Sequence, residues 1–96
     1  MMTRSARLVL FGLLAMMGLA QLPARAAELV MFDDPACVWC RKWLAEVGPG
    51  YPHSEEGQRA PLRRVDITEQ GRSGVALRTR VTATPTFVLV EAGQEV

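Results

Sequence analysis

The sequence is poor in the residues that build metal centres and disulfide frameworks. Its 96 residues include only two cysteines and one histidine. Two cysteines are too few for a small domain held by several disulfides, and too few for a cysteine-rich structural zinc site. The single histidine, His53, lies in a segment rich in proline and glycine. We expect it to be a solvated polar residue rather than a ligand or a general base.

The sequence also lacks an excess of charge of either sign. Eleven Lys and Arg residues oppose ten Asp and Glu residues, which gives a formal net charge of +1. This near-balance provides no basic surface for nucleic acid and no acidic tail. Apolar residues make up 49% of the chain and charged residues 22%, as in an ordinary globular protein. The length allows one small domain at most.

No apolar run in the sequence is long enough to cross a membrane. The longest covers residues 8–20, whereas a transmembrane helix needs about 18 or more apolar residues. Arg4 and Arg7 precede the run without an acidic residue, and Ala24-Arg25-Ala26 follows it. This pattern is typical of a secretory signal peptide, with an uncleaved membrane anchor as the alternative.

The expected cleavage after Ala26 divides the chain into a signal peptide, residues 1–26, and a mature domain, residues 27–96. The two arginines before the apolar run are not adjacent, which favours a Sec-type signal over a twin-arginine signal. We therefore expect a periplasmic protein without a membrane span after cleavage. Disulfides form and persist in that compartment.

Short apolar runs predict the strands of the mature domain. Residues 29–32 and 87–90 are continuously apolar, as in strands buried on both faces. Residues 62–67 end in an alternating pattern and predict another strand. A glycine turn at residues 92–94 precedes Glu95-Val96, which would begin a fourth strand.

One helix is well marked in the sequence, and two others are weaker. Apolar residues at the i, i+3, i+4 and i+7 spacing of an amphipathic helix are Cys40, Trp43, Leu44 and Val47. This helix should end at Gly48-Pro49-Gly50 and place Trp43 in the core. Ser54 could cap one helical turn in the loop that follows. Residues 68–80 are a weak helix candidate, diluted by two glycines.

The two cysteines form one Cys-x-x-Cys motif, Cys37-Val38-Trp39-Cys40, directly after the first expected strand. A zinc site would need a second pair of ligands, and attachment of c-type haem would need a histidine where Arg41 stands. A purely structural disulfide would contribute little, because closing so short a loop stabilises by only about 1.9 kcal/mol. A redox-active pair explains the spacing best.

The expected helix gives the two cysteines different roles. Cys37 would lie at the helix N-terminus, where unpaired N–H groups and the helix dipole stabilise a thiolate, so we expect it to be the attacking nucleophile. Cys40 lies on the buried stripe and would be the resolving thiol. Arg41 and Lys42 should help to hold the anion, whereas the acidic pair at residues 33–34 would oppose it if close.

A second motif, Thr84-Pro85-Thr86, stands just before the expected strand at residues 87–90. Alone, it suits an ordinary trans proline at the start of a strand. Together with the Cys-x-x-Cys motif, it resembles the thioredoxin superfamily over residues 28–96. That resemblance implies a three-layer α/β fold, with a βαβ unit followed by a β-hairpin.

The thioredoxin resemblance also implies a substrate-binding site beside the dithiol. In that superfamily the proline is cis, and the backbone of the preceding residue pairs with the substrate. Carried over, Pro85 would be the cis proline and Thr84 the residue that meets the substrate. Trp39, between the cysteines, either packs on the substrate chain or is simply a half-exposed aromatic residue. Arg63-Arg64 is expected to be a solvent-facing pair.

Further residues resemble the SoxS family, periplasmic thioredoxin-like proteins of bacterial sulfur-oxidation operons. They are residues 32–40, Trp43, Glu46, Pro49, Tyr51-Pro52, Glu56-Gly57 and residues 60–66. The resemblance implies a thiol–disulfide oxidoreductase that needs no cofactor or metal. Its partners would be the carrier-protein machinery of thiosulfate oxidation, which it keeps reduced, and a membrane thiol transporter that supplies electrons. No nucleic-acid partner is expected.

Two departures from thioredoxin itself leave other functions open. Val38-Trp39 replaces Gly-Pro between the cysteines, and Met31 stands where thioredoxin has a buried acid on its first strand. A disulfide oxidase or isomerase on the same scaffold is one alternative. A Cu(I) carrier that uses Cys37, Cys40 and His53 is another.

The chain has only eleven residues after Pro85. We therefore expect a C-terminally truncated domain that lacks the last strand and the C-terminal helix of the fold. One apolar face of the sheet would then be uncovered.

Overall fold

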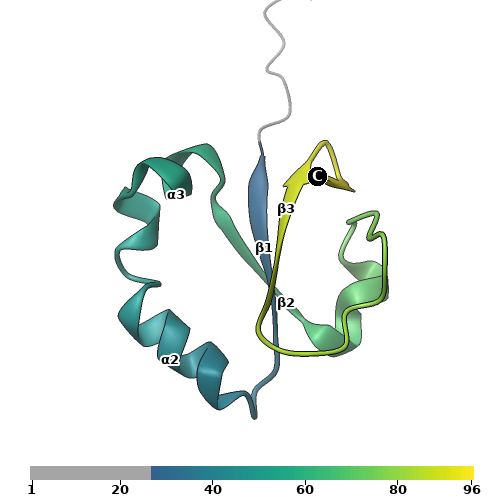
Figure 1. The fold of residues 1–96 in the computed structure, drawn as a ribbon, viewed down its shortest axis with the longest axis horizontal. Helices are drawn as coiled ribbons and strands as arrows, with labels where there is room; N and C mark the ends of the chain where they lie inside the picture. Colours follow the sequence, from purple (N-terminus) through teal and green to yellow (C-terminus); the bar gives the residue numbers. More distant parts are fainter. Residues whose placement is uncertain (1–26) are drawn as a thin grey trace, which may run out of the picture.

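The computed structural model describes residues 27–96, which form a four-stranded sheet with helical segments on both faces (Figure 1). In chain order the elements are β1 (Glu28–Asp33), α2 (Val38–Glu46), η1 (Tyr51–His53), α3 (Glu55–Arg59), β2 (Leu62–Asp66), η2 (Ile67–Arg72), β3 (Thr86–Glu91) and β4 (Gln94–Glu95). The segments labelled η are 3₁₀-helices. The expected signal peptide lies outside the described residues. None of the described helices is long and apolar enough to span a bilayer.

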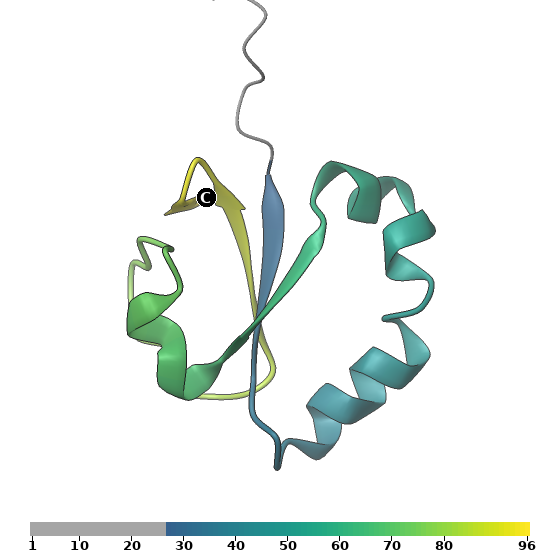
Figure 2. The same ribbon diagram turned by 180° about the vertical axis from the view of Figure 1, so that it is seen from behind.

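The strands follow the order β2-β1-β3-β4 across the sheet. β1 pairs in parallel with β2 and antiparallel with β3, and β3 pairs antiparallel with β4. The parallel pair requires a crossover, which α2, η1 and α3 supply on one face of the sheet. η2 lies on the opposite face, as the view from behind also shows (Figure 2). The expected three-layer α/β arrangement is therefore present.

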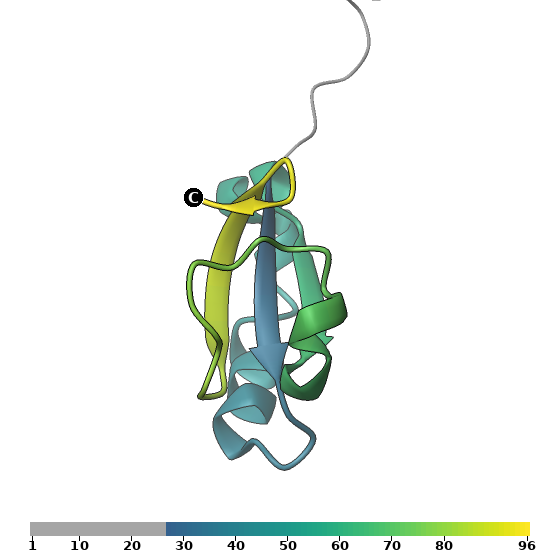
Figure 3. The same ribbon diagram turned by 90° about the vertical axis from the view of Figure 1, so that its right-hand side faces the viewer.

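β1 is central and is covered on both faces. Val30 and Phe32 pack into one cluster with residues of β2 and β3, whereas Met31 packs on the other face with both cysteines. All three β1 side chains are 0% exposed. This double burial explains why the strand is a continuous apolar run. The sheet seen face-on has β1 between β2 and β3 (Figure 3).

β3 is buried on one face only, which corrects the expectation of a strand buried on both. Val88 and Val90 are 7% and 1% exposed, but Phe87 and Leu89 on the other face are 37% and 44% exposed. Phe87 is partly covered by Trp43 of α2, with ring centroids 4.8 Å apart. The α2 side of the sheet therefore carries a partly uncovered apolar surface.

The weak helix expected over residues 68–80 is wrong. A 3₁₀-helix ends at Arg72, and Gly74 adopts a φ of +76°, which turns the chain out of helical geometry. Ser73 stops the helix locally, because its hydroxyl donates to the carbonyl of Gln70 and accepts from the amide of Val75. By contrast, Ser54 caps α3 as expected, with its hydroxyl accepting from the amide of Gly57.

The start of a fourth strand follows the glycine turn, as the sequence predicts. β4 consists of Gln94–Glu95, and the amide of Val96 donates to the carbonyl of Leu89 at 3.0 Å. The turn before it places Ala92 and Gly93 at positive φ, as a tight hairpin requires. The truncation expected from the sequence stays a prediction.

Arg63 and Arg64 face solvent as expected, with side chains 38% and 56% exposed, but each is also held in an ion pair. Adjacent strand residues point to opposite faces, and each arginine meets a carboxylate of β1. Arg63 binds Glu28 at 2.8 Å, and this hydrogen bond raises the pKa of the guanidinium, against a smaller opposing effect of burial. Arg64 binds Asp33 at 2.6 Å. Both ion pairs fasten β2 to β1.

Candidate active site

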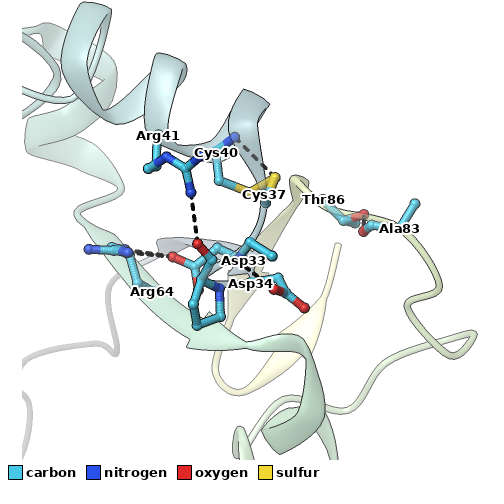
Figure 4. The surroundings of a disulfide bond; sticks show 10 residues. Asp33, Asp34, Cys37, Cys40, Arg41, Arg64, Ala83 and Thr86 are labelled. Atoms are coloured by element: carbon cyan, nitrogen blue, oxygen red, sulfur yellow. Dashed lines mark hydrogen bonds and ion pairs between the residues drawn. A yellow bond between two sulfur atoms is a disulfide. The ribbon is translucent and has the colours of Figure 1, made fainter.

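The two cysteines form a disulfide at the start of α2, with their Cα atoms 5.2 Å apart (Figure 4). A short turn after β1 brings Cys37 to this place. The amide of Cys37 donates to the carbonyl of Asp34 at 3.0 Å, and the Asp34 carboxylate accepts from the amide of Ala36 at 2.8 Å. The Cys-x-x-Cys motif thus follows the end of β1 and lies at the N-terminus of α2, as the sequence predicts.

Cys37 is the N-cap residue of α2. Its backbone is extended, and its Sγ accepts a hydrogen bond from the amide of Cys40 at 3.1 Å. An N–H group at a helix N-terminus is also the positive end of the helix dipole, so this sulfur sits where negative charge is stabilised. Cys37 is 9% exposed and Cys40 is 2% exposed. Cys37 is the sulfur that an incoming group can reach more readily.

Cys40 is enclosed by apolar side chains. Its cluster consists of Met31 and Cys37, with Trp43, Leu44 and Leu62 packed against it. Met31 lies where thioredoxin carries an acid, and its thioether cannot accept a proton from a thiol. A buried carboxylate, that of Asp33, lies two residues beyond Met31 on the same face of β1, where Arg64 holds it in an ion pair.

The charged residues near the motif are paired in ways that the sequence did not reveal. Asp33 is buried, and Arg64 neutralises it through Nε at 2.7 Å and Nη2 at 2.6 Å. The anticipated repulsion from this carboxylate is thereby reduced. The ion pair depends on the parallel register of β1 and β2, which aligns Arg64 with Met31 and so brings Arg64 within reach of Asp33 on the same strand. That register cannot be read from the sequence alone.

Arg41 and Lys42 are engaged with other groups rather than with the sulfur of Cys37. Arg41 donates to the carbonyl of Pro35 at 2.8 Å, which braces the turn before the motif. The ammonium of Lys42 lies 5.4 Å from the centroid of the Trp39 ring, in a cation–π contact. These two side chains therefore shape the rim of the site, and the helix N-terminus supplies the stabilisation of the anion.

The residues between the cysteines form an exposed apolar surface. Val38 is 62% exposed and Trp39 is 66% exposed. Two large apolar side chains left in solvent beside a reactive disulfide suit contact with a partner chain. The Trp39 ring is therefore accessible to a partner chain.

The Thr84–Pro85 peptide bond is cis, as the thioredoxin resemblance implies. The pairing of Thr86 with Phe32 places this bond beside the end of β1, next to the turn that leads to Cys37. Ala83 and Thr86 lie in the surroundings of the disulfide in Figure 4. Within residues 27–96, no hydrogen bond occupies the main chain of Thr84. That main chain is free to pair with a substrate.

His53 is not brought to the cysteines to form a ligand set. It is exposed in η1, and within the described part of the chain no three His, Cys, Asp or Glu side chains are placed to hold a metal ion. The alternative of a Cu(I) carrier with His53 as third ligand therefore lacks its geometry.

One solved structure shows clear similarity to this chain. It is the crystal structure of the periplasmic thioredoxin SoxS from Paracoccus pantotrophus in its reduced form, with 40% sequence identity and a TM-score of 0.68. The alignment covers 72% of this chain and 73% of that one. No protein-family model and no curated relative matches the chain.

Proposed function

This chain belongs to the family of the thioredoxin SoxS, and we propose that its Cys37–Cys40 pair reduces a disulfide in a partner protein. The family and the observed bond make the chain a thioredoxin-like protein with a redox-active Cys-x-x-Cys disulfide. The direction of electron flow and the partner protein are what we propose.

The reaction proceeds through two thiol–disulfide exchanges. The Cys37 thiolate attacks one sulfur of the partner disulfide, forms a mixed disulfide and releases the other partner sulfur as a thiolate. Cys40 then loses its proton to water or to the released thiolate. Its sulfur attacks Cys37 Sγ, which releases the second partner sulfur. Two electrons pass from the dithiol to the partner, and the Cys37–Cys40 disulfide forms.

The observation that carries this assignment is the hydrogen bond from the Cys40 amide to Cys37 Sγ. It stabilises negative charge on Cys37 Sγ before the attack on the partner disulfide. Within residues 27–96 no such donor meets Cys40 Sγ, and apolar side chains pack around Cys40, so charge on its sulfur is disfavoured. Cys37 is therefore the nucleophile and Cys40 the resolving thiol.

The partner chain would lie across the surface formed by Trp39, Thr84 and Pro85. The free main chain of Thr84 offers hydrogen bonds to an extended backbone, and the exposed ring of Trp39 offers apolar contact. Such backbone pairing is independent of sequence, so selectivity would come from side chains such as Trp39.

We assign the activity to the periplasm, on the strength of the expected signal peptide and the stated location of the SoxS relative. The partner proposed is a carrier protein of the sulfur-oxidation system with a disulfide or modified cysteine. A membrane thiol transporter would return electrons to Cys37–Cys40. Both partners rest on the family resemblance.

Two measurements test the proposed direction. The reduced chain should reduce insulin disulfides, and its reduction potential should lie toward the reducing end of the superfamily range. A potential near −120 mV, about that of a strong disulfide oxidant, would instead support the oxidase or isomerase alternative. A Cys37→Ser variant provides the control, because it should lose insulin reduction entirely.

A further inference from the structure

Gln70 is a buried polar residue that the redox chemistry does not use. It is 8% exposed and lies in η2, on the sheet face opposite α2. Its side-chain Nε2 donates to the carbonyl of Val81 at 2.9 Å, and its Oε1 accepts from the amide of Val81 at 2.8 Å. Nε2 also donates to the carbonyl of Ile67 at 3.1 Å. The side-chain amide thus satisfies both main-chain groups of one residue.

Val81 stands four residues before Pro85, at the entrance to the segment that carries the cis peptide. Its own side chain is 7% exposed and belongs to the core cluster of Val30 and Phe32. Beyond it, Thr82 and Ala83 are exposed. The bonds from Gln70 are therefore the last buried main-chain contacts before the segment enters solvent.

The other end of the segment is also fixed by a side chain. The hydroxyl of Thr86 donates to the carbonyl of Ala83 at 2.6 Å, and Thr86 itself pairs with Phe32 in the sheet. Residues 82–85 are thus held between two anchors, Gln70 at Val81 and the sheet at Thr86. Between them the Thr84 main chain stays unpaired, within the described residues.

We propose that Gln70 is a positioning residue for substrate binding, because it fixes Val81 and so holds the Thr84 main chain ready to pair with the partner backbone. This inference rests on the proposed function. A binding segment that is already ordered loses less conformational entropy when a substrate docks. Loss of the anchor should therefore weaken the binding of an extended chain without changing the chemistry at Cys37.

The test compares a protein disulfide, which needs the groove, with a small one, which does not. Gln70→Leu keeps the volume but removes all three hydrogen bonds. In the full chain it should raise KM for insulin about tenfold with little change in kcat, since buried hydrogen bonds to Val81 are lost. Reduction of the small disulfide 5,5′-dithiobis(2-nitrobenzoate) should stay within about twofold of wild type. The matched control is Gln58→Leu, an exposed position on α3.

The outcomes separate this inference from the proposed function. A wild-type chain that reduces neither substrate overturns the proposed function and this inference with it. A wild-type chain that reduces both, with the same ratio of insulin to small-disulfide activity in Gln70→Leu, overturns this inference alone. A merely structural role for Gln70 would lower both activities together, which also contradicts the proposal.

Amide hydrogen exchange on the wild-type chain keeps the inference testable if Gln70→Leu does not fold. The Val81 amide, which Gln70 holds, should exchange at least about 100-fold more slowly than the exposed amide of Thr82, since exchange requires local opening. Equal exchange rates at Val81 and Thr82 would show that Gln70 does not anchor the segment.

Discussion

At the scale of single residues, the two cysteines differ mainly in what touches their sulfur atoms. Cys37 receives the Cys40 amide at a helix N-terminus, while Cys40 faces Met31 and other apolar side chains. This asymmetry follows from the three-residue spacing, because one cysteine caps the helix and the other lies one turn inside it. The acid beside the motif, Asp33, is neutralised by Arg64 and adds little to the contrast.

The carboxyl group of Asp66 should make the stability of the fold depend on pH. It caps η2, and hydrogen bonds from the hydroxyl and the amide of Thr68 hold the pKa of its carboxyl below the usual value of about 3.8. The folded state therefore binds this proton less readily than the unfolded state. Asp66 stabilises the fold above about pH 4, and that contribution is lost as pH falls through the lowered pKa.

We expect Asp66→Asn to show a smaller loss of stability than wild type between about pH 5 and pH 2. Urea unfolding at a series of pH values measures this difference. Thr68→Val, which removes the hydroxyl donor, should give an intermediate dependence. An Asp66→Asn chain with the acid sensitivity of wild type would contradict the assignment.

At the scale of elements, the close packing of α3 against η1 depends on Gly57. A Cβ at Gly57 would overlap the main-chain carbonyl oxygen of Tyr51, which cannot rotate away. Tyr51 is itself fixed, since its hydroxyl donates to the carbonyl of Ala60 at 2.6 Å. Burial raises the pKa of this phenol, with a further contribution from Glu56.

Gly57→Ala should therefore destabilise the chain by about 1–3 kcal/mol or more, as overpacking does. Gly71→Ala is the matched control, because a Cβ there meets no atom within 4 Å. We expect it to change stability by less than about 1 kcal/mol, and a reduced unfolded-state entropy favours a gain. Urea unfolding of both variants measures the contrast, which equal effects would contradict.

The elements that could be predicted from sequence are those whose signal is local. The doubly buried run of β1, the helix α2 and the Ser54 cap of α3 each depend on neighbours within a few residues. Val47 is the exception in the predicted stripe, because it is the C-cap of α2 and is 44% exposed. The segment after η2 could not be predicted in this way. Its path depends on Gln70, whose side chain takes a main-chain partner eleven residues away at Val81, and a propensity argument does not detect such a bond.

The same difference between local and non-local signals separates the site residues that could be predicted from those that could not. The disulfide pair and the cis proline could be predicted, the first from spacing and the second from resemblance. The ion pair of Arg64 with Asp33 could not, because it depends on how β2 registers against β1. Two adjacent arginines on a predicted strand must point to opposite faces, but the sequence does not show which carboxylate each one meets.

At the scale of the whole molecule, the two faces of the sheet are unequally covered. Val88 and Val90 lie in a closed cluster on the η2 side, while Phe87 and Leu89 on the α2 side remain 37% and 44% exposed. The sequence led us to expect an uncovered apolar face, and the poor solubility that should follow from it is still a prediction. Exposed apolar surface of this kind favours association.

Two substitutions on adjacent residues of β3 test this asymmetry. Leu89→Thr should raise solubility and change stability by less than about 1 kcal/mol, since the side chain is already half in solvent. Val90→Thr should cost about 1–3 kcal/mol, because its hydroxyl is buried without a partner. Precipitation by ammonium sulfate and urea unfolding measure the two effects. Equal losses of stability would show that both faces are covered in solution.

The central claim is that Cys37 attacks a partner disulfide and Cys40 resolves the complex. The most direct measurement is covalent trapping in the periplasm with Cys40→Ser, and with Cys37→Ser as its counterpart. A partner protein should accumulate as a mixed disulfide through Cys37 in the first variant and should be released by dithiothreitol, while the second variant traps none. A partner held instead through Cys40 in the Cys37→Ser chain would contradict the account.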